Sequence, residues 1–388
     1  MSLTHVESLA RAALPEITGD LRRLVGLETP SADKELLTAG LAAVESWTHD
    51  RLGPPDESRR YDGGPHGDML ELLYRGTSPA VVLVLCHYDT VWPAGTLAEW
   101  PFRTDGDGRA TGPGVFDMKC GLVQAVWALR LLRERDLPRP SVRLFLNGDE
   151  EIGSPASRPH IERLSEDATA TLVCEASAGP EGALKTSRKG VGLFEVTVEG
   201  VEAHAGLDPY RGASAVHALA ELVTRVAGLG SRERGTTVNV GVIGGGTGRN
   251  VIAGRASCGI DVRVPDPAEA ARVDAALASL APSDPRVRVS VTGGWNRPPM
   301  VPTPASRLLF AQAHAAAQEL GWPLRETAVG GASDGNFVSG LGRPVLDGLG
   351  AVGDGAHARH EHVLLDHIPP RTALLAGLLM ASSLTELT

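Results

Sequence analysis

Ala80-Val-Val-Leu-Val-Leu-Cys86 is an unbroken run of apolar residues, and His87, Tyr88 and Asp89 follow it at once. A continuous apolar run, unlike an alternating one, is typical of a strand buried on both faces of a parallel sheet. The run therefore predicts a central strand whose carboxyl end presents His87 and Asp89. Open α/β sheets place their ligand sites at this edge, so we expect a site there.

Three further segments repeat this arrangement of a short apolar strand followed by ionisable residues. These segments are Val142–Leu146 before Glu150 and Glu151, Thr171–Cys174 before Glu175, and Pro344–Gly348 before a glycine-rich stretch and His357. Between the strand at Ala80–Cys86 and the strand at Val142–Leu146, residues 117–136 carry apolar side chains at spacings of three and four. This spacing predicts a crossover helix opened by Asp117. We therefore predict an α/β domain with a mostly parallel sheet and helices on both faces.

The pattern changes between residues 186 and 298. Strands and helices there alternate as strand, helix, strand, strand, helix, strand, which is the order of a ferredoxin-like unit. Since the α/β pattern resumes after Pro302, we predict one domain formed by residues 1–185 and 299–388 and a second domain, residues 186–298, inserted into it. A chain of 388 residues also exceeds the roughly 250–300 residues at which single cores stop growing.

Composition excludes several classes of protein. The chain has 37 basic and 47 acidic residues and a net charge of −10, which disfavours a nucleic-acid partner. Charges interrupt the first twenty residues, and no apolar run approaches the ~20 residues of a membrane span, so we expect no membrane partner. The cysteines have no CxxC spacing, and we expect reduced thiols and a cytoplasmic location. They are Cys86, Cys120, Cys174 and Cys258.

Five residues form a candidate metal centre: His87, Asp117, Glu151, Glu175 and His357. Imidazole and carboxylate groups suit Zn²⁺, and a shared carboxylate can bridge two ions ~3.5–4 Å apart in two-metal hydrolases. Each residue alone is explained more simply as a surface or capping group. Because several strands bring these residues to one edge of the sheet, the set as a whole predicts a metal centre.

Leu85–Val91 resembles the first metal motif of the di-zinc peptidases that include acetylornithine deacetylase, succinyl-diaminopimelate desuccinylase, aminoacylase and the glutamate carboxypeptidases. Four further motifs follow in the order found in that family. They are Gly112–Gly121 for the bridging aspartate, Asn147–Ser154 for the paired glutamates, Glu202–Gly206 for a histidine of the inserted domain, and Gly355–His357 for the last ligand. The resemblance covers essentially the whole chain and is greatest for glutamate carboxypeptidases of the carboxypeptidase G type.

The resemblance implies two Zn²⁺ ions per subunit, with Co²⁺ or Mn²⁺ as alternatives. It implies that His87 and Glu175 bind one ion, that Glu151 and His357 bind the other, and that Asp117 bridges them. These ligands would lie in a catalytic domain formed by residues 1–185 and 299–388.

Three further roles follow from the resemblance. Asp89 would orient the imidazole of His87. Glu150 would be the general base that takes a proton from water and passes one to the leaving nitrogen. Spacing alone leaves the reverse assignment open, with Glu150 as ligand and Glu151 as base. His204 would steady the carbonyl oxygen of the substrate across a dimer interface, which implies a homodimer built through residues 186–298.

Substrate contacts are implied by shorter matches. Arg263 and Arg297 resemble the positions that hold substrate carboxylates in glutamate carboxypeptidases, and Asn250 resembles a polar substrate contact. An arginine fork matches a carboxylate with two hydrogen bonds, and an exposed arginine in an ion pair is the alternative at both positions. Gly330–Phe337 resembles the glycine-rich loop beside the substrate.

We therefore expect a zinc-dependent metallo-exopeptidase that hydrolyses the amide bond of a C-terminal amino acid, first of all glutamate, in a small peptide or N-acyl amino acid. In the family, Glu at the position of Glu175 goes with carboxypeptidases and deacylases, whereas Asp goes with aminopeptidases. The alternative is an N-acyl-amino-acid deacylase of the acetylornithine deacetylase or aminoacylase type. A non-catalytic metal- or peptide-binding protein is a third hypothesis, against which the presence of Glu150 and His204 argues.

Overall fold

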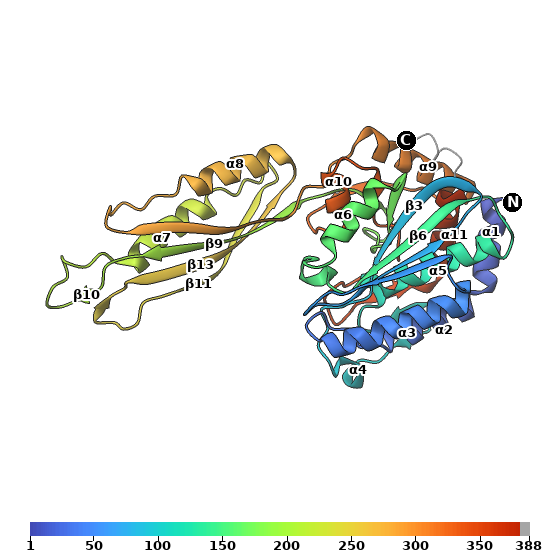
Figure 1. The fold of residues 1–388 in the computed structure, drawn as a ribbon, viewed down its shortest axis with the longest axis horizontal. Helices are drawn as coiled ribbons and strands as arrows, with labels where there is room; N and C mark the ends of the chain where they lie inside the picture. Colours follow the sequence, from blue (N-terminus) through green and yellow to red (C-terminus); the bar gives the residue numbers. More distant parts are fainter. Residues whose placement is uncertain (381–388) are drawn as a thin grey trace. The chain divides into compact units, whose positions relative to one another are not determined.

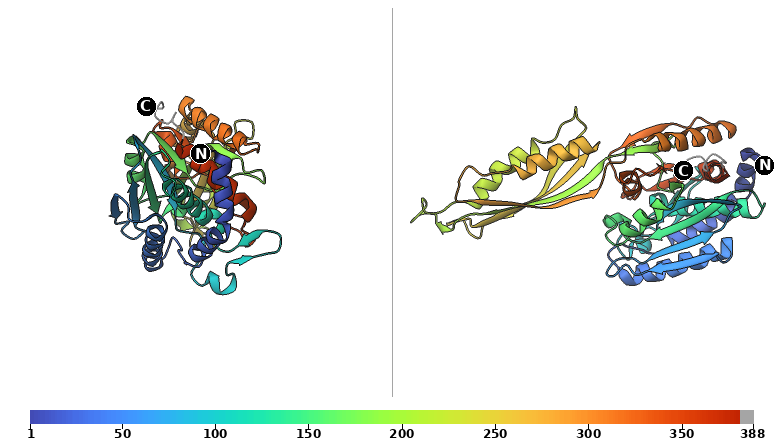
Figure 2. Two further views of the ribbon diagram at one scale, coloured as in Figure 1. Left: turned by 90° about the vertical axis from the view of Figure 1, so that its right-hand side faces the viewer. Right: turned by 45° about the horizontal axis from the view of Figure 1, so that its top comes forward.

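The computed structural model describes residues 1–380, which fall into two compact units (Figures 1 and 2). The larger unit comprises Met1–Ser187, Pro302–Val329 and the chain from Ser333 onward. The smaller unit comprises Arg188–Val301 and Gly330–Ala332. Each unit has its own cluster of buried apolar side chains, so each has the core that a separate domain requires.

A six-stranded sheet with the order β1-β2-β6-β3-β7-β16 forms the centre of the larger unit. β6, β3, β7 and β16 are parallel, whereas β1 and β2 are antiparallel additions at one edge. The predicted mostly parallel sheet is thus confirmed. The strands are β1 Glu57–Tyr61, β2 Met69–Tyr74, β3 Ser78–His87, β6 Pro140–Asn147, β7 Ala170–Val173 and β16 Val345–Leu346.

Strand β3 is buried on both of its faces. Val82, Val84 and Cys86 pack into the main core, and the alternate residues Leu83 and Leu85 are buried as well. This double burial is the reason that the strand is continuously apolar. At about 1.5–3 kcal/mol for each large apolar side chain, the packing fixes the strand, and with it the position of the residues that follow. The helices of this unit are α1 Leu3–Ala12, α2 Leu14–Val25, α3 Lys34–Leu52, α4 Thr96–Glu99, α5 Cys120–Arg133, α6 Arg158–Glu166, α9 Pro304–Glu319, α10 Gly335–Gly340 and α11 Ile368–Met380.

The crossover helix begins later than its periodicity predicts. Val115–Lys119 form a single wide turn in which Asp117 and Met118 have non-helical backbone angles, and regular α5 starts only at Cys120. Apolar spacing marks the face of a helix but not its first residue, which explains the difference. Asp117 therefore lies in an irregular turn, where regular helix hydrogen bonding does not satisfy its backbone N–H.

A second, four-stranded sheet has the order β17-β18-β5-β4. The turn between β17 and β18 carries His357, so a further strand, β17, lies between Val345–Leu346 and this residue, where the sequence predicted only a glycine-rich stretch. The antiparallel pairing of β18 with β5 brings the segment before Asp117 close to the segment after His357. The remaining strands of this unit are β4 Arg103–Thr104, β5 Arg109–Thr111, β8 Leu184–Arg188, which ends at the first residue of the smaller unit, β15 Glu326–Val329, β17 Gly353–Asp354 and β18 His362–Leu364.

The smaller unit has the predicted ferredoxin-like order of elements. Its antiparallel sheet has the order β11-β13-β9-β14, and α7 and α8 contribute to the core on one face of that sheet. The elements are β9 Gly190–Glu199, β10 Ala203–His204, α7 Ala215–Ala227, β11 Thr237–Gly245, β12 Val251–Ile252, β13 Arg255–Val264, α8 Pro267–Ala278 and β14 Arg288–Arg297. Within residues 1–380, every helix is too short or too polar to cross a bilayer.

Candidate active site

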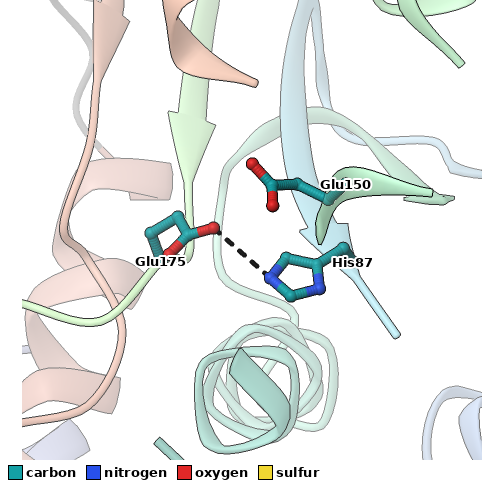
Figure 3. A group of neighbouring side chains, drawn as sticks. All are labelled: His87, Glu150 and Glu175. Atoms are coloured by element: carbon teal, nitrogen blue, oxygen red, sulfur yellow. Dashed lines mark ion pairs between the residues drawn. The ribbon is translucent and has the colours of Figure 1, made fainter. Parts of the chain in front are cut away.

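His87 and Glu175 meet at the carboxyl edge of the large sheet. β3 and β7 are adjacent parallel strands, with Leu85 opposite Val173, so both chains leave the sheet on the same side. The Nε2 atom of His87 lies 3.4 Å from Oε1 of Glu175, as Figure 3 shows. Both residues are buried. A buried imidazole facing a buried carboxylate is an arrangement that suits a metal ion.

Asp117 contacts two imidazoles at once. Its Oδ1 atom lies 3.2 Å from Nε2 of His87, and its Oδ2 atom lies 3.3 Å from Nε2 of His357. His357 in turn has its own glutamate, because its Nε2 atom is 3.0 Å from Oε2 of Glu151. The five ligand candidates thus form two histidine–glutamate pairs that share one aspartate.

The donor atoms in this cluster fit metal ions. Atoms of His87, Asp117 and Glu151 all lie within 4.8 Å of one another, and so do atoms of His87, Glu150 and Glu175. The Oε1 atom of Glu151 is buried and has no hydrogen-bond partner among the described residues. Leaving a buried oxygen without a partner costs about 1–3 kcal/mol, and a cation would remove that cost.

Asp89 supports both the imidazole and the glutamate pair. Nδ1 of His87 lies 3.0 Å from the backbone oxygen of Asp89 and 3.3 Å from its Oδ1 atom. The Asp89 carboxylate also accepts the backbone N–H groups of Glu150 and Glu151, at 3.3 and 3.2 Å. Because Nδ1 faces acceptors only, it carries a proton, and Nε2 is left to face the cluster.

Ser31 is a member of this network that sequence reasoning missed. Its hydroxyl donates to Oδ2 of Asp89 at 2.7 Å, across 58 positions of the chain. The residue precedes the first strand of the sheet, and no local pattern connects it to Asp89.

The adjacent residues Glu150 and Glu151 face different histidines of the site. Glu150 opens a single 3₁₀ turn, Glu150–Ile152, and its carboxylate lies on the same side of His87 as that of Glu175 (Figure 3). Glu151 contacts His357 instead. Since adjacent residues in a tight turn point in different directions, this turn lets each glutamate serve a different part of the site.

The carboxylates raise the pKa values of both imidazoles. Burial lowers the pKa of His87, but hydrogen bonds to Asp117, Asp89 and Glu175 outweigh burial and hold that pKa well above its ordinary value. Hydrogen bonds to Asp117 and Glu151 raise the pKa of His357 to about 11. Burial, followed by the charge of Asp117, raises the pKa of Glu151 to about 7. Without metal, these raised pKa values favour the protonated form of both imidazoles.

We expect zinc binding to release protons at pH 7, from the two imidazoles and in part from Glu151, because metal ligands must be deprotonated. Both imidazole pKa values are raised in the folded metal-free protein, so apparent zinc affinity should rise as pH increases from 6 to 8. Calorimetric titration of metal-free protein in buffers of different ionisation enthalpy measures the proton count. The His362→Ala variant, which changes a histidine outside the cluster, should behave like wild type. A binding enthalpy that does not vary with the buffer would contradict this prediction.

His204 and Asn250 lie together in the smaller unit. His204, in β10, pairs with β12, and the backbone N–H of Ala205 donates to the backbone oxygen of Asn250 at 2.9 Å. Nδ1 of the exposed His204 ring accepts the backbone N–H groups of Gly206 and Leu207, each at 3.0 Å. A ring nitrogen that accepts carries no proton, so the neutral ring is protonated at Nε2 and can donate there.

Arg263 and Arg297 also lie in the smaller unit, and each is opposite Val191 of the strand between them. Directly opposite residues point to the same face of a sheet, so the two arginines share a face. Arg263 already binds a carboxylate, with its Nε and Nη2 atoms 2.8 and 2.9 Å from Asp261. Arg297 is 5% exposed, and its Nη1 atom donates to Asn296 at 3.2 Å.

Comparison with known proteins agrees with this geometry. Residues 83–381 match the profile of Peptidase family M20/M25/M40. The chain belongs to this family. It is 30% identical to carboxypeptidase G2 of Pseudomonas sp. (strain RS-16) over 94% of this chain and 89% of that protein. It is 28% identical to succinyl-diaminopimelate desuccinylase of Xanthomonas euvesicatoria pv. vesicatoria (strain 85-10), over 81% of this chain and 87% of the relative.

Solved structures of M20 peptidases share the fold. An aminopeptidase from Bacillus cereus ATCC 10987 superposes with a TM-score of 0.75 at 20% identity, covering 95% of this chain and 98% of the other. A metallo-carboxypeptidase from Sulfolobus solfataricus gives 0.73 at 18% identity, covering 94% and 98%. The M20 chain is therefore a metal-dependent hydrolase of the carboxypeptidase-like type, and the predicted enzyme class is confirmed.

Proposed function

We propose that this M20 peptidase is a di-zinc carboxypeptidase that releases a C-terminal glutamate from a peptidyl or N-acyl partner. The observation that carries the di-zinc part is the position of Asp117, whose two carboxylate oxygens face different imidazoles at 3.2 and 3.3 Å. His87 with Glu175 would hold one ion and His357 with Glu151 the other, with Asp117 shared. Co²⁺ or Mn²⁺ would suit the same oxygen and nitrogen donors.

Zinc bound at this centre would polarise the scissile carbonyl and lower the pKa of a water molecule. Glu150 takes a proton from the attacking water on its carboxylate and delivers it to the leaving nitrogen. Asp89 holds the imidazole of His87 in one orientation through Nδ1, and it fixes the backbone at Glu150 through the hydrogen bond at 3.3 Å. These contacts fix the backbone of the proposed base.

His204 would donate to the carbonyl oxygen as negative charge develops on it, and its neutral ring carries the required proton at Nε2. We propose that this histidine acts on the site of the partner subunit in a homodimer. β11 supports the dimer, because it is an edge strand with exposed apolar side chains: Val242 is 72% and Ile243 is 62% exposed. Edge strands of this kind pair readily with another chain.

The proposed preference for glutamate rests on two arginines and on the similarity to carboxypeptidase G2. Arg297 and Arg263 share one face of the smaller unit, and Asn250 lies beside His204 in the same unit. Both arginines are candidates for the substrate carboxylate, and Arg263 also binds Asp261 of its own strand. The 30% identity to carboxypeptidase G2 across nearly the whole chain supports a carboxypeptidase. The buried free cysteines support a reducing, cytoplasmic location.

A deacylase is the second candidate. The similarity to succinyl-diaminopimelate desuccinylase, 28% identity over 81% of this chain, favours it specifically. The metal chemistry would be the same, and the two candidates differ in which side of the amide the arginine holds.

A substrate panel tests this proposal. We expect N-benzoyl-glutamate and dipeptides with a C-terminal glutamate to be hydrolysed. Their kcat/KM should be at least ~10-fold above the values for N-acetyl-ornithine and N-succinyl-diaminopimelate. Arg297→Gln should raise KM for the glutamate substrates about 10–100-fold, since a charged hydrogen bond contributes about 1.5–3 kcal/mol. Arg263→Gln tests the second candidate arginine in the same assay. Turnover of the N-acetyl or N-succinyl substrates in preference to the glutamates would favour the deacylase.

A further inference from the structure

Glu361 is a buried carboxylate that has no role in the site described so far. It is fully buried, and both of its oxygens accept hydrogen bonds. Oε1 accepts the backbone N–H groups of Phe116 at 2.8 Å and Asp117 at 3.0 Å. Oε2 accepts the backbone N–H of Gly114 at 3.1 Å and the indole N–H of Trp92 at 3.0 Å. One side chain therefore satisfies four donors.

These four donors belong to segments that carry the metal-ligand candidates. Trp92 lies just after Asp89, Gly114 caps the wide turn Val115–Lys119, and Phe116 and Asp117 belong to that turn, which presents the shared carboxylate. Glu361 itself follows His357 by four positions, in the turn between β17 and β18. Its carboxylate thus connects three segments that are up to 269 residues apart in sequence.

The turn around Asp117 needs an acceptor of this kind. Asp117 and Met118 have non-helical backbone angles, so the N–H groups of this turn are not satisfied as in a regular helix. A buried N–H without a partner destabilises the conformation that leaves it so. The Glu361 carboxylate accepts three of these groups, including the backbone N–H of Asp117 itself. The position of the shared carboxylate therefore depends on Glu361.

The loop that carries Glu361 is wound tightly. Gly355 has φ of 85°, and a Cβ atom added there would lie 2.8 Å from the backbone nitrogen of Glu361. The guanidinium of Arg359 lies over the rings of Trp92 and Trp100, 5.5 and 5.8 Å from their centres. The loop is thus packed on the same tryptophan that donates to Glu361, which limits how far His357 can move.

We infer that Glu361 is a positioning residue that holds Asp117 and His357 at the separation needed to bind the second metal ion, the one also held by Glu151. This inference rests on the proposed di-zinc function. Glu361 does not contact the ligand atoms of the centre; it acts through the backbone of the Asp117 turn and through its own loop. Residues that orient metal ligands typically contribute 10–100-fold to metal affinity.

The test compares zinc binding by Glu361→Gln and wild type. An amide has one acceptor oxygen, so two of the four donors would lose their acceptor and face an NH₂ group. We expect the affinity for the second zinc ion to fall about 10–100-fold, with the first ion bound nearly as before. Competition with a chelator gives the two affinities, and the visible spectrum of the Co²⁺-loaded protein reports changed coordination at the second site.

Glu269→Gln is the matched control. Glu269 is also a buried glutamate with several hydrogen bonds, to Thr236 at 2.6 Å and to Arg272 at 2.7 Å, and it lies in the other unit. Its variant should lower the melting temperature without changing zinc affinity. If Glu361→Gln does not fold, Trp92→Phe provides the test, because it removes one donor and leaves the other three. It should lower the affinity for the second zinc ion by a smaller factor than Glu361→Gln.

Failure of the inference about Glu361 can be distinguished from failure of the proposed di-zinc function. If Glu361→Gln melts earlier, as Glu269→Gln does, yet binds both ions with wild-type affinity and spectrum, Glu361 is only structural and the inference is overturned. If wild-type protein itself binds fewer than two ions, the proposed di-zinc function fails, and the inference fails with it.

Discussion

Glu150→Gln should lower kcat by about 10²–10⁴-fold while leaving the zinc content at two ions per chain. The amide of glutamine cannot take a proton from water, whereas it preserves the size of the side chain and the backbone hydrogen bond to Asp89. Substrate affinity should change little, because the loss affects only proton transfer. Steady-state kinetics on N-benzoyl-glutamate and metal analysis of the same preparation provide the two measurements.

Glu151→Gln is the natural comparison, since it makes the same substitution at the neighbouring residue. Glu151 contacts His357 at 3.0 Å, and one of its oxygens is buried with no hydrogen-bond partner in residues 1–380. Its variant should therefore lose zinc as well as activity. The opposite result, with metal lost from Glu150→Gln and retained by Glu151→Gln, would show that the roles of ligand and base are reversed.

Mixing two inactive variants should restore activity if His204 acts across the dimer. Glu150→Ala retains His204, and His204→Ala retains Glu150, so a hybrid dimer has one complete site. Dissociating and reassociating an equal mixture should recover about a quarter of the wild-type rate, because about half of the randomly formed dimers are hybrids. Activity of the mixture, compared with that of each variant alone, is the measurement.

Blocking the edge strand provides the control for this experiment. Val242→Lys, introduced into both variants, should shift sedimentation toward the monomer and abolish the recovery, because lysine on an edge strand opposes strand pairing. Leu308→Lys is the matched substitution, since Leu308 is 55% exposed on α9 in the other unit. It should leave sedimentation and recovery unchanged. A mixture that forms hybrids, as seen by native mass spectrometry, but stays inactive would show that His204 does not act across the dimer.

Patterns local in sequence predicted the parts of the fold that depend on local packing. The run Ala80–Cys86 is continuously apolar because both faces of β3 are buried, and that burial determines where His87 leaves the sheet. Glu175 could be placed at the same edge for the same reason. Asp261 and Arg263 are two residues apart on one strand and so point to the same face. Their ion pair could therefore also have been predicted from the sequence.

Contacts between distant segments left no such pattern. The start of α5 at Cys120, after an irregular turn, depends on acceptors supplied by Glu361, which lies far along the chain. The turn position of His357 depends on pairing between β18 and β5, two strands of three residues each. Strands so short carry too few residues for an apolar period to show. Ser31 and Glu361 were missed for this reason.

The insertion of the smaller unit has a consequence for how the protein matures. His87, Asp117, Glu151 and Glu175 precede the inserted unit in the chain, whereas His357 follows it. Domains fold largely as units in the order of their synthesis. The ribosome therefore completes residues 188–301 while the larger unit still lacks α9, α11 and His357. We expect that the nascent chain cannot load a full pair of ions and that metal acquisition is an event of the finished polypeptide.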